Sequence, residues 1–314
     1  MMAKTFQQLI DANKRNSILL SGLMFVLIVV VAFAVSMVWG GGDWRFGLLP
    51  AGIAAVVVFC LILFSFYGGG ETIMALSKAG PLQKGDDPQL YNVVEEMTLA
   101  AGLPTPKVYL INDPAPNAFA TGRDPAHAMV AITTGLRAKL TRPELQGVIA
   151  HEISHVRNFD IRFAMLMAVL VGFLVLLSDI FLRSMIFGGV GGRRSRRSGG
   201  GGGQGMAILM IVALILSIVA PILAKLIQLA HSRQREYLAD ASAIDLTRNP
   251  DGLAGALAKL ARDPNKLAVA NRATQHLYIV NPLKPFESRK QNNLFSTHPP
   301  IEDRISRILS LKKA

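Results

Sequence analysis

Four long runs of apolar residues dominate the hydrophobic pattern of this 314-residue chain. They cover residues 16–39, 46–67, 163–182 and 206–223. Each is close to the roughly 20 residues that an α-helix needs to cross the hydrocarbon core of a bilayer. The first two are joined by the glycine-rich turn at 40–43, which favours a helical hairpin. We therefore expect an integral membrane protein with about four transmembrane or membrane-embedded helices.

The composition favours membrane insertion over a buried core. The third and fourth runs also suit a buried helical hairpin, because Asp179 lies inside the third and Pro221 near the end of the fourth. However, 51% of the residues are hydrophobic and the mean hydropathy is +0.37, which is high for a soluble domain. The first run resembles a signal peptide, but another apolar run follows at once and no small-residue cleavage site is evident. An uncleaved anchor is expected.

Between and after the apolar runs, the pattern changes to that of a small α+β domain. A helix is predicted over residues 88–102, followed by three short β-rich segments at 107–111, 117–121 and 128–133. These segments predict a three-stranded sheet. The last part of the chain is predicted to be helical, with two apolar faces formed by Leu253, Leu257 and Leu260 and by Ile305, Ile308 and Leu311.

Residues 151–155, His-Glu-Ile-Ser-His, carry the clearest chemical signal. On an α-helix, residues four apart share a face, so both imidazoles can point at one metal ion while Glu152 reaches a water beside it. Thr141 and Glu144 form a predicted capping box and Pro143 suits the first turn, so a helix starts just upstream. The alternative is a pair of ordinary helical histidines.

A catalytic zinc site usually takes three protein ligands and keeps a fourth position for water. The metzincin class would require glycine and histidine where this chain has Asn158 and Ile161, so that class is excluded. The chain has six histidines and one cysteine, Cys60, so no thiolate site and no intramolecular disulfide can form. The third ligand is therefore expected to be a carboxylate from a second helix.

The segment 231–240 offers such a carboxylate. Glu236 and Asp240 are four apart and share a helix face. Glu236 would bind the metal, and Asp240 would accept a hydrogen bond from the far nitrogen of His151 or His155. The alternative is an exposed helix whose charges pair with Arg233 and Arg235.

Together with these residues, two further motifs resemble the HtpX-type family of membrane-bound zinc metallopeptidases, in a wider group with the CAAX prenyl proteases. The motifs, in chain order, are Asn-Ala-Phe-Ala-Thr-Gly at 117–122, the 151–155 motif, Arg-Glu-Tyr-Leu-Ala-Asp-Ala at 235–241 and Ser-Thr-His-Pro-Pro-Ile-Glu-Asp-Arg-Ile at 296–305. The resemblance implies a mainly helical zincin domain that binds one Zn²⁺ through His151, His155 and Glu236, with Glu152 as the base.

The resemblance also implies roles for residues that carry no signal by themselves. Asn117 and Ala118 would belong to an edge strand that binds the substrate backbone. His298 would lie near the active site as a catalytic donor to the oxyanion, or would orient a ligand; the alternative is a loop histidine. Arg304 would pair with Asp240 or Glu236.

The predicted segments divide the chain into four parts. Residues 1–70 form a membrane hairpin, and 71–162 form the first part of the catalytic domain. Residues 163–224 form a second hairpin with a Gly/Arg-rich loop at 188–205, and 225–314 complete the catalytic domain with the third ligand. Because His151 and Glu236 must meet, the second hairpin leaves and returns on the catalytic side.

The distribution of charge predicts the orientation. The catalytic side would carry Lys4, Lys14, Arg15, Lys78, Lys84, Arg157, Arg162, Lys225, Arg233 and Arg235, and the opposite loops Arg45, Arg193, Arg194, Arg196 and Arg197. By the positive-inside rule the catalytic side faces the cytoplasm, although the arginines of 193–197 oppose this. The net charge of +12 suits contact with anionic lipid headgroups. The Gly/Arg loop is expected to be a flexible linker without nucleic-acid binding, since it has no interleaved aromatic residues.

The predicted function is zinc-dependent cleavage of membrane or misfolded proteins at a cell inner or plasma membrane. A role in quality control under stress is implied by the resemblance alone. Two alternatives stay open: a CAAX-type peptidase for prenylated tails, and a zinc-binding membrane scaffold that does not cut. The expected partners are protein substrates and the lipid bilayer, and a homo-oligomer is compatible with the sequence.

Overall fold

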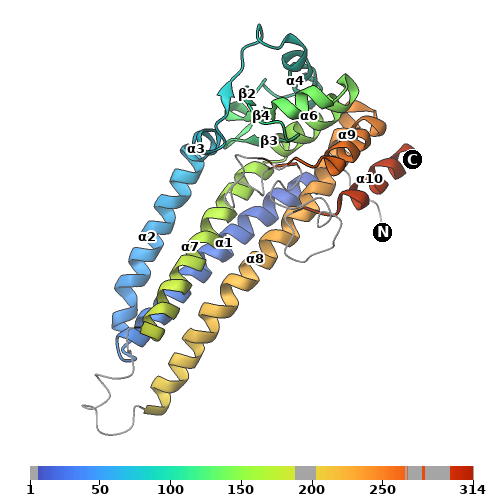
Figure 1. Cartoon of the computed structure of the whole chain (residues 1–314). Helices are drawn as coiled ribbons and strands as arrows, with labels where there is room; N and C mark the ends of the chain where they lie inside the picture. Colours follow the sequence, from blue (N-terminus) through green and yellow to red (C-terminus); the bar gives the residue numbers. More distant parts are fainter. Residues whose placement is uncertain (1–5, 188–202, 266, 268–277, 280–297, 314) are drawn as a thin grey trace. The chain divides into compact units, whose positions relative to one another are not determined.

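The computed structural model describes residues 6–187, 203–265, 267, 278–279 and 298–313 (Figure 1). The described part is mainly helical, with four long apolar helices and one four-stranded mixed sheet, which confirms the predicted α+β membrane class. It divides into two compact units. Unit 1 contains described residues of Met1–Ile10, Phe66–Met165 and Leu229–Ala314, and unit 2 contains those of Asp11–Ser65 and Leu166–Gln228.

Unit 2 consists of parts of four long helices. These are α1 (Phe6–Trp39), α2 (Arg45–Tyr67), α7 (Asp160–Phe187) and α8 (Gly203–Thr247), as labelled in Figure 1. By length and composition, each contains a segment that can cross a membrane. These segments are Lys14–Trp39, Arg45–Tyr67, Asp160–Ile186 and Gly205–Thr247.

Apolar side chains in unit 2 lie on the surface as well as inside. Ile28 and Val58 are fully buried, whereas Ile18 is 74% exposed and Leu49 is 72% exposed. Such an apolar exterior is unfavourable in water and suits a hydrocarbon solvent. Asp179, the acidic residue inside the third apolar run, is paired with Arg183 one turn later, at 2.7 Å.

Helix α8 is continuous over 45 residues and contains both the fourth apolar run and the Glu236 segment. Pro221 lies inside it without ending it. The proposed domain boundaries at 162/163 and 224/225 therefore fall inside continuous helices, and the four-part division stays a prediction. Most of the predicted Gly/Arg-rich loop, up to residue 202, lies outside the described residues, and residues 203–205 begin α8.

The sheet of unit 1 has the order β1-β2-β4-β3, with β2 and β4 parallel and both outer pairs antiparallel. Its strands are β1 (Gly80–Pro81), β2 (Lys107–Ile111), β3 (Ala118–Thr121) and β4 (Met129–Thr133). The three predicted strands are present, but the prediction of three strands in total was wrong. β1 is a Gly-Pro pair without any alternating pattern, and the backbone bond from Leu82 N–H to Val108 C=O, 2.9 Å, holds it beside β2.

Short-range signals set the ends of the unit 1 helices. Asp87 caps α4 (Pro88–Ala101), and Gly102 ends it with a φ of 67°. Before α6 (Arg142–Arg157), the Glu144 carboxylate accepts from the Thr141 backbone N–H at 2.8 Å, as the predicted capping box requires, and also from the Thr141 hydroxyl at 2.8 Å. The other elements are α3 (Gly69–Leu76), η1 (Pro125–His127), α5 (Thr134–Lys139), α9 (Pro250–Arg262), α10 (Ile301–Ser310) and η3 (Leu311–Lys313).

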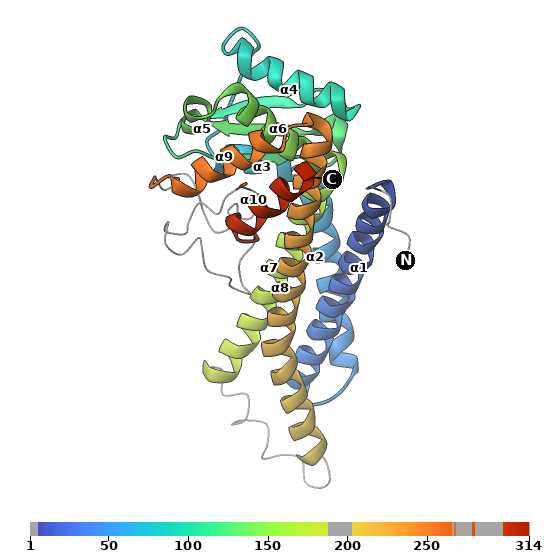
Figure 2. The same ribbon diagram turned by 90° about the vertical axis from the view of Figure 1, so that its right-hand side faces the viewer.

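Helix α6 is central to the packing of unit 1. It contacts β3, α4 and α9. Helix α9 in turn contacts α10 (Figure 2). The predicted apolar face of α9 is buried at Leu253, Leu257 and Leu260. In α10, Ile308 is buried as predicted, but Leu311 is 44% exposed. That part of the prediction was wrong because α10 ends at Ser310 and Leu311 begins a 3₁₀ turn with a different periodicity.

Glycine allows α6 and α9 to approach closely. A Cβ atom on Gly147 of α6 would lie 2.7 Å from the Leu253 backbone nitrogen of α9. One on Gly252 would lie 2.6 Å from the Pro143 carbonyl oxygen. Because both obstacles are backbone atoms, neither contact is relieved by a side-chain rotation. The α6–α9 interface therefore needs glycine at these two positions.

Replacing Gly147 with alanine is expected to destabilise unit 1 by about 1–3 kcal/mol, as for other overpacked cores. The measurement is the thermal unfolding midpoint in detergent. Gly52→Ala in α2 is the matched control, because a Cβ there meets nothing within 4 Å. An unchanged midpoint for Gly147→Ala would contradict the proposed close approach.

Candidate metal centre

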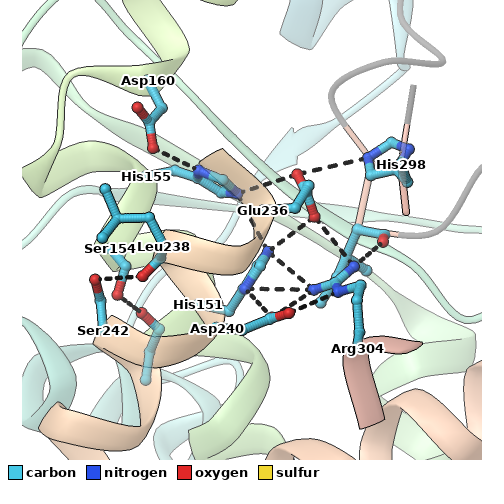
Figure 3. Close-up of polar contacts among 12 residues, drawn as sticks. His151, Ser154, His155, Asp160, Glu236, Leu238, Asp240, Ser242, His298 and Arg304 are labelled. Carbon is cyan, nitrogen blue, oxygen red and sulfur yellow. Dashed lines mark hydrogen bonds and ion pairs between the residues drawn. The ribbon is translucent and has the colours of Figure 1, made fainter. Parts of the chain in front are cut away.

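Helix α6 presents His151 and His155 side by side. Their rings are 4.7 Å apart between centroids and nearly perpendicular, and their Nε2 atoms face each other at 3.1 Å (Figure 3). Two nitrogens bound tetrahedrally to one zinc ion, at 2.0–2.1 Å each, would lie about 3.3 Å apart. The one-turn spacing of the motif thus brings two ligand atoms to a common point.

Glu236 of α8 completes a cluster with the two histidines. Its Oε1 lies 3.5 Å from His155 Nε2, and its Oε2 lies 3.6 Å from His151 Nε2. One ligand atom from each of the three residues lies within 4.8 Å of the others, and this is the single such group of His, Cys, Asp and Glu side chains in the part of the chain that the structure describes. Glu236 Oε2 is buried without a hydrogen bond of good geometry. Two imidazoles and one carboxylate form a ligand set that suits catalytic zinc.

The electrostatics of the cluster favour a positive charge. Burial lowers the pKa of His155, but its contacts with Asp160 and Glu236 outweigh burial and raise the pKa to about 10. The pKa of His151 is also raised, since Asp240 and Glu236 outweigh the effect of burial. A site that binds protons this strongly also attracts a cation, and a metal would compete with those protons for the same nitrogens.

Asp240 contacts the Nδ1 atom of His151, and Arg304 lies beside both Asp240 and Glu236. Asp240 Oδ1 lies 3.0 Å from His151 Nδ1. Arg304 of α10 donates to both oxygens of Asp240, at 2.9 and 2.7 Å, and its Nη1 lies 3.1 Å from Glu236 Oε2. Arg304 is fully buried. Burial lowers its pKa, but Asp240 and Glu236 more than offset this, so the guanidinium stays charged.

Asp160 and Arg235 form a similar arrangement around His155, which sequence reasoning missed. Asp160 Oδ2 lies 3.0 Å from His155 Nδ1, and Asp160 Oδ1 lies 3.1 Å from Arg235 Nη1. The alternative of an exposed helix whose charges pair with Arg235 is wrong at this residue, because the Arg235 side chain is 4% exposed. An acidic residue in the first turn of a helix is common, so the sequence around Asp160 carried no specific signal.

Glu152 lies beside the cluster but outside it. Its side chain is 1% exposed, burial raises its pKa, and the backbone N–H of Ala120 lies against its carboxylate. Its Oε1 atom is buried without a hydrogen-bond partner among the described residues. One oxygen of Glu152 is therefore available to accept a proton.

His298 also lies at the cluster. It is 7% exposed, and its Nε2 lies 3.8 Å from Glu236 Oε1 (Figure 3). Burial lowers its pKa to about 4, against the opposing effect of Glu236, so the imidazole is neutral near pH 7. The two prolines that follow lead directly into α10, where Pro300 is the N-cap residue. The preceding Ser296 and Thr297 of the motif lie outside the described residues, as does His276.

Asn117 and Ala118 lie at the edge of the sheet next to α6, and both are buried. Thr133 N–H donates to Asn117 C=O, so alternate residues along β3 bond to β4. The backbone groups of Ala118 and Ala120 point to the other edge of β3, which pairs with no further strand among the described residues. The Ala118 C=O already accepts from Ile279 N–H at 3.0 Å, and the Ala118 N–H donates to the Asn117 side chain. Ala120 is therefore the outward-facing residue of β3 nearest to Glu152.

The protein family that the sequence matches agrees with the geometry of this site. The family model for Peptidase family M48 matches residues 84–312, which contain every residue of the site. The chain belongs to peptidase family M48. It is thus a zinc metallopeptidase, and its His151, His155 and Glu236 cluster is consistent with the ligand set of such an enzyme.

Three bacterial relatives, each called a protease HtpX homolog, are similar over nearly the whole length of this M48 chain. The relative from Dictyoglomus thermophilum is 45% identical over 304 residues, covering 97% of this chain and 94% of the relative. The one from Listeria monocytogenes serovar 1/2a is 46% identical and covers 96% of this chain and 98% of the relative. The one from Caldanaerobacter subterraneus is 44% identical, with 99% of both covered. The HtpX-type resemblance is confirmed.

One solved structure, a crystal structure of S. mikatae Ste24p, is also similar to this M48 chain. It is 20% identical, with a TM-score of 0.48, and the similarity covers 95% of this chain and 66% of that one.

Proposed function

We propose that this M48 zinc peptidase is an endopeptidase that cleaves membrane proteins and their misfolded cytoplasmic parts, in membrane-protein quality control under stress. The observation that carries this proposal is a cluster of His151, His155 and Glu236, in which His151 and Glu236 are buried and His155 is half-buried, with Glu152 beside it. The same chain has four apolar helices long enough to cross a bilayer. A peptidase anchored in a bilayer is held close to membrane substrates at high local concentration.

His151, His155 and Glu236 would hold the zinc ion. When bound, zinc supplies Lewis-acid polarisation of the scissile carbonyl and makes water more acidic. Glu152 takes a proton from the attacking water as the oxygen adds to the carbonyl carbon. Glu152 then passes the proton to the leaving amine as the C–N bond breaks. The raised pKa of its buried carboxyl group supports both transfers, since it brings the group closer to neutral pH.

His298 and strand β3 would handle the substrate. A neutral His298 imidazole keeps one N–H to donate toward the developing oxyanion. An extended peptide would pair with the outward edge of β3 through the Ala120 C=O, because the Ala120 N–H is bonded to Glu152, and through the Ala118 C=O where Ile279 yields its bond. Asn117 supports this edge by accepting the Ala118 N–H with its side chain.

The substrate class is tested with purified, vesicle-reconstituted protein. The substrates are a destabilised membrane protein, its stable parent, and one peptide with and without a farnesyl group. We expect cleavage of the destabilised protein in preference to its parent, without any requirement for farnesyl. A chelator should stop the reaction and zinc should restore it. Cleavage of the farnesylated peptide alone would overturn the proposal in favour of tail processing, and zinc binding without any cleavage would favour a scaffold.

We also propose that unit 1 faces the cytoplasm, as the distribution of lysine and arginine predicts. The orientation is tested by replacing Cys60 with serine and adding one cysteine, either Asp43→Cys between α1 and α2 or Lys84→Cys in unit 1. In right-side-out membrane vesicles, a membrane-impermeant maleimide should label position 43 and not position 84. The reverse labelling would overturn the orientation.

A further inference from the structure

The two histidines of the cluster are supported in the same way but from different parts of unit 1. His151 contacts Asp240, which is paired with Arg304, and His155 contacts Asp160 (Figure 3). Asp160 is in turn paired with Arg235. We propose that Asp160 is a positioning residue for His155 and that Arg235 holds Asp160 in place. The inference rests on the proposed role of His155 as a zinc ligand.

The contact with Asp160 determines which nitrogen of His155 is available. An imidazole has one N–H and one lone pair when neutral, and a carboxylate 3.0 Å from Nδ1 keeps the proton on that nitrogen. The lone pair then lies on Nε2, the atom that faces His151 and Glu236. Without Asp160, the ring would be free to take the other tautomer and to rotate.

Arg235 compensates the buried charge of Asp160. Both side chains are 5% exposed. Arg235 Nη1 lies 3.1 Å from Asp160 Oδ1 and donates to the Asp160 backbone C=O at 3.0 Å, so it contacts both the side chain and the backbone of this residue. The guanidinium also lies 4.1 Å from the centre of the Phe163 ring. A buried carboxylate without a cation is strongly unfavourable, which gives Arg235 a defined role.

The same pair connects two of the three expected ligands. Asp160 is the first residue of α7, just after His155, while Arg235 directly precedes Glu236 on α8. A contact between Asp160 and Arg235 therefore restricts the rotation of this turn of α8 about its axis, relative to the end of α6. The distance between His155 Nε2 and Glu236 Oε1, 3.5 Å, depends on that rotation.

The test compares zinc affinity among full-length, detergent-purified variants, using a chromophoric zinc chelator as competitor. Asp160→Ala is expected to weaken zinc binding by about 10–100-fold, as for other outer partners of metal ligands. It should also change the visible spectrum of the Co²⁺-substituted protein, because the geometry of the ligands changes. Asp179→Ala is the matched control: it removes an acidic residue from the same helix α7, but one that pairs with Arg183 in unit 2. It should bind zinc like the wild type.

Two further variants separate positioning from general stability. Asp160→Asn keeps an acceptor oxygen for His155 and should restore most of the lost affinity and the cobalt spectrum. Arg235→Met should weaken zinc binding in the wild-type background but have little further effect beside Asp160→Ala, because it acts through Asp160. If Asp160→Ala does not fold, Arg235→Met is compared with the wild type and with Asp179→Ala, and zinc binding by Arg235→Met within about twofold of both overturns the proposal.

The proposal is overturned if Asp160→Ala binds zinc within about twofold of the wild type with an unchanged cobalt spectrum. It is also overturned if Asp160→Asn is as weak as Asp160→Ala, or if Arg235→Met acts independently of Asp160 in the double variant. These readouts do not require proteolysis. A wild-type protein that binds zinc without cleaving any substrate would defeat the proposed function and leave the role of Asp160 testable.

Discussion

Replacing Glu152 with glutamine is expected to lower the rate of peptide hydrolysis by about 10²–10⁴-fold, the usual contribution of a positioned general base. Glutamine has the same shape and still accepts a hydrogen bond from the Ala120 N–H, but it cannot take a proton from water near neutral pH. Since Glu152 is not a member of the three-residue cluster, zinc content should stay at the wild-type level.

The measurement is cleavage of an unstructured protein by detergent-purified wild type and Glu152→Gln, with zinc quantified in both samples. Glu71→Gln, the same change on an exposed part of α3, is the matched control and should keep full activity. Equal cleavage by wild type and Glu152→Gln would remove Glu152 from the mechanism. Loss of zinc together with activity would instead indicate that Glu152 helps to hold the metal.

Replacing Arg304 with methionine is expected to destabilise unit 1 by roughly 3–5 kcal/mol, the cost of removing one partner from a buried ion pair. Arg304 is fully buried and provides the cation beside both Asp240 and Glu236. Methionine is of similar length but carries no charge and donates no hydrogen bond. The carboxylates of Asp240 and Glu236 would therefore remain buried without the cation that Arg304 provides. The hydrogen bond that Arg304 donates to the Ile279 C=O, at 3.1 Å, would also be lost.

The measurement is thermal unfolding in detergent, with excess zinc and with a chelator. The loss of stability should be larger in chelator, because bound zinc would compensate the charge of Glu236. Arg307→Met is the matched control one turn along α10: this exposed arginine lies over the Tyr237 ring at 3.9 Å, a contact worth about 0.5–1 kcal/mol. Equal effects of the two substitutions would show that the buried ion pairs of Arg304 contribute little.

Much of the site was predictable because its geometry is local in the sequence. The four-residue spacing of His151 and His155 puts two imidazoles on one helix face, whatever surrounds that helix. The Thr141–Glu144 capping box is equally local, and the structure has it as predicted. The membrane class follows from the length and the apolar composition of four runs, which are also local properties of the sequence. The short strand β1 was not predictable, since a Gly-Pro pair becomes a strand only through its neighbour β2.

The supporting contacts are decided by residues far apart in the chain. We expected Asp240 to serve either histidine, and the structure assigns it to His151 while Asp160 contacts His155. The pairing of Arg304 with Asp240 and Glu236 agrees with the expectation that it would contact one of them. Ile279 bonds to the edge of β3 at Ala118, which no pattern in the sequence indicated.

By itself, the sequence determined the apolar helices, the metal-binding turn of α6 and the carboxylate turn of α8, because each depends on side chains within a few positions of one another. Only the tertiary structure decided which carboxylate supports which histidine, that Arg235 and Arg304 are buried, and which backbone groups of β3 bond to β4 and which point away from it. The physical reason is that burial and hydrogen-bond pairing depend on how helices and strands pack, and that packing is set by contacts between residues that are tens of positions apart in the sequence.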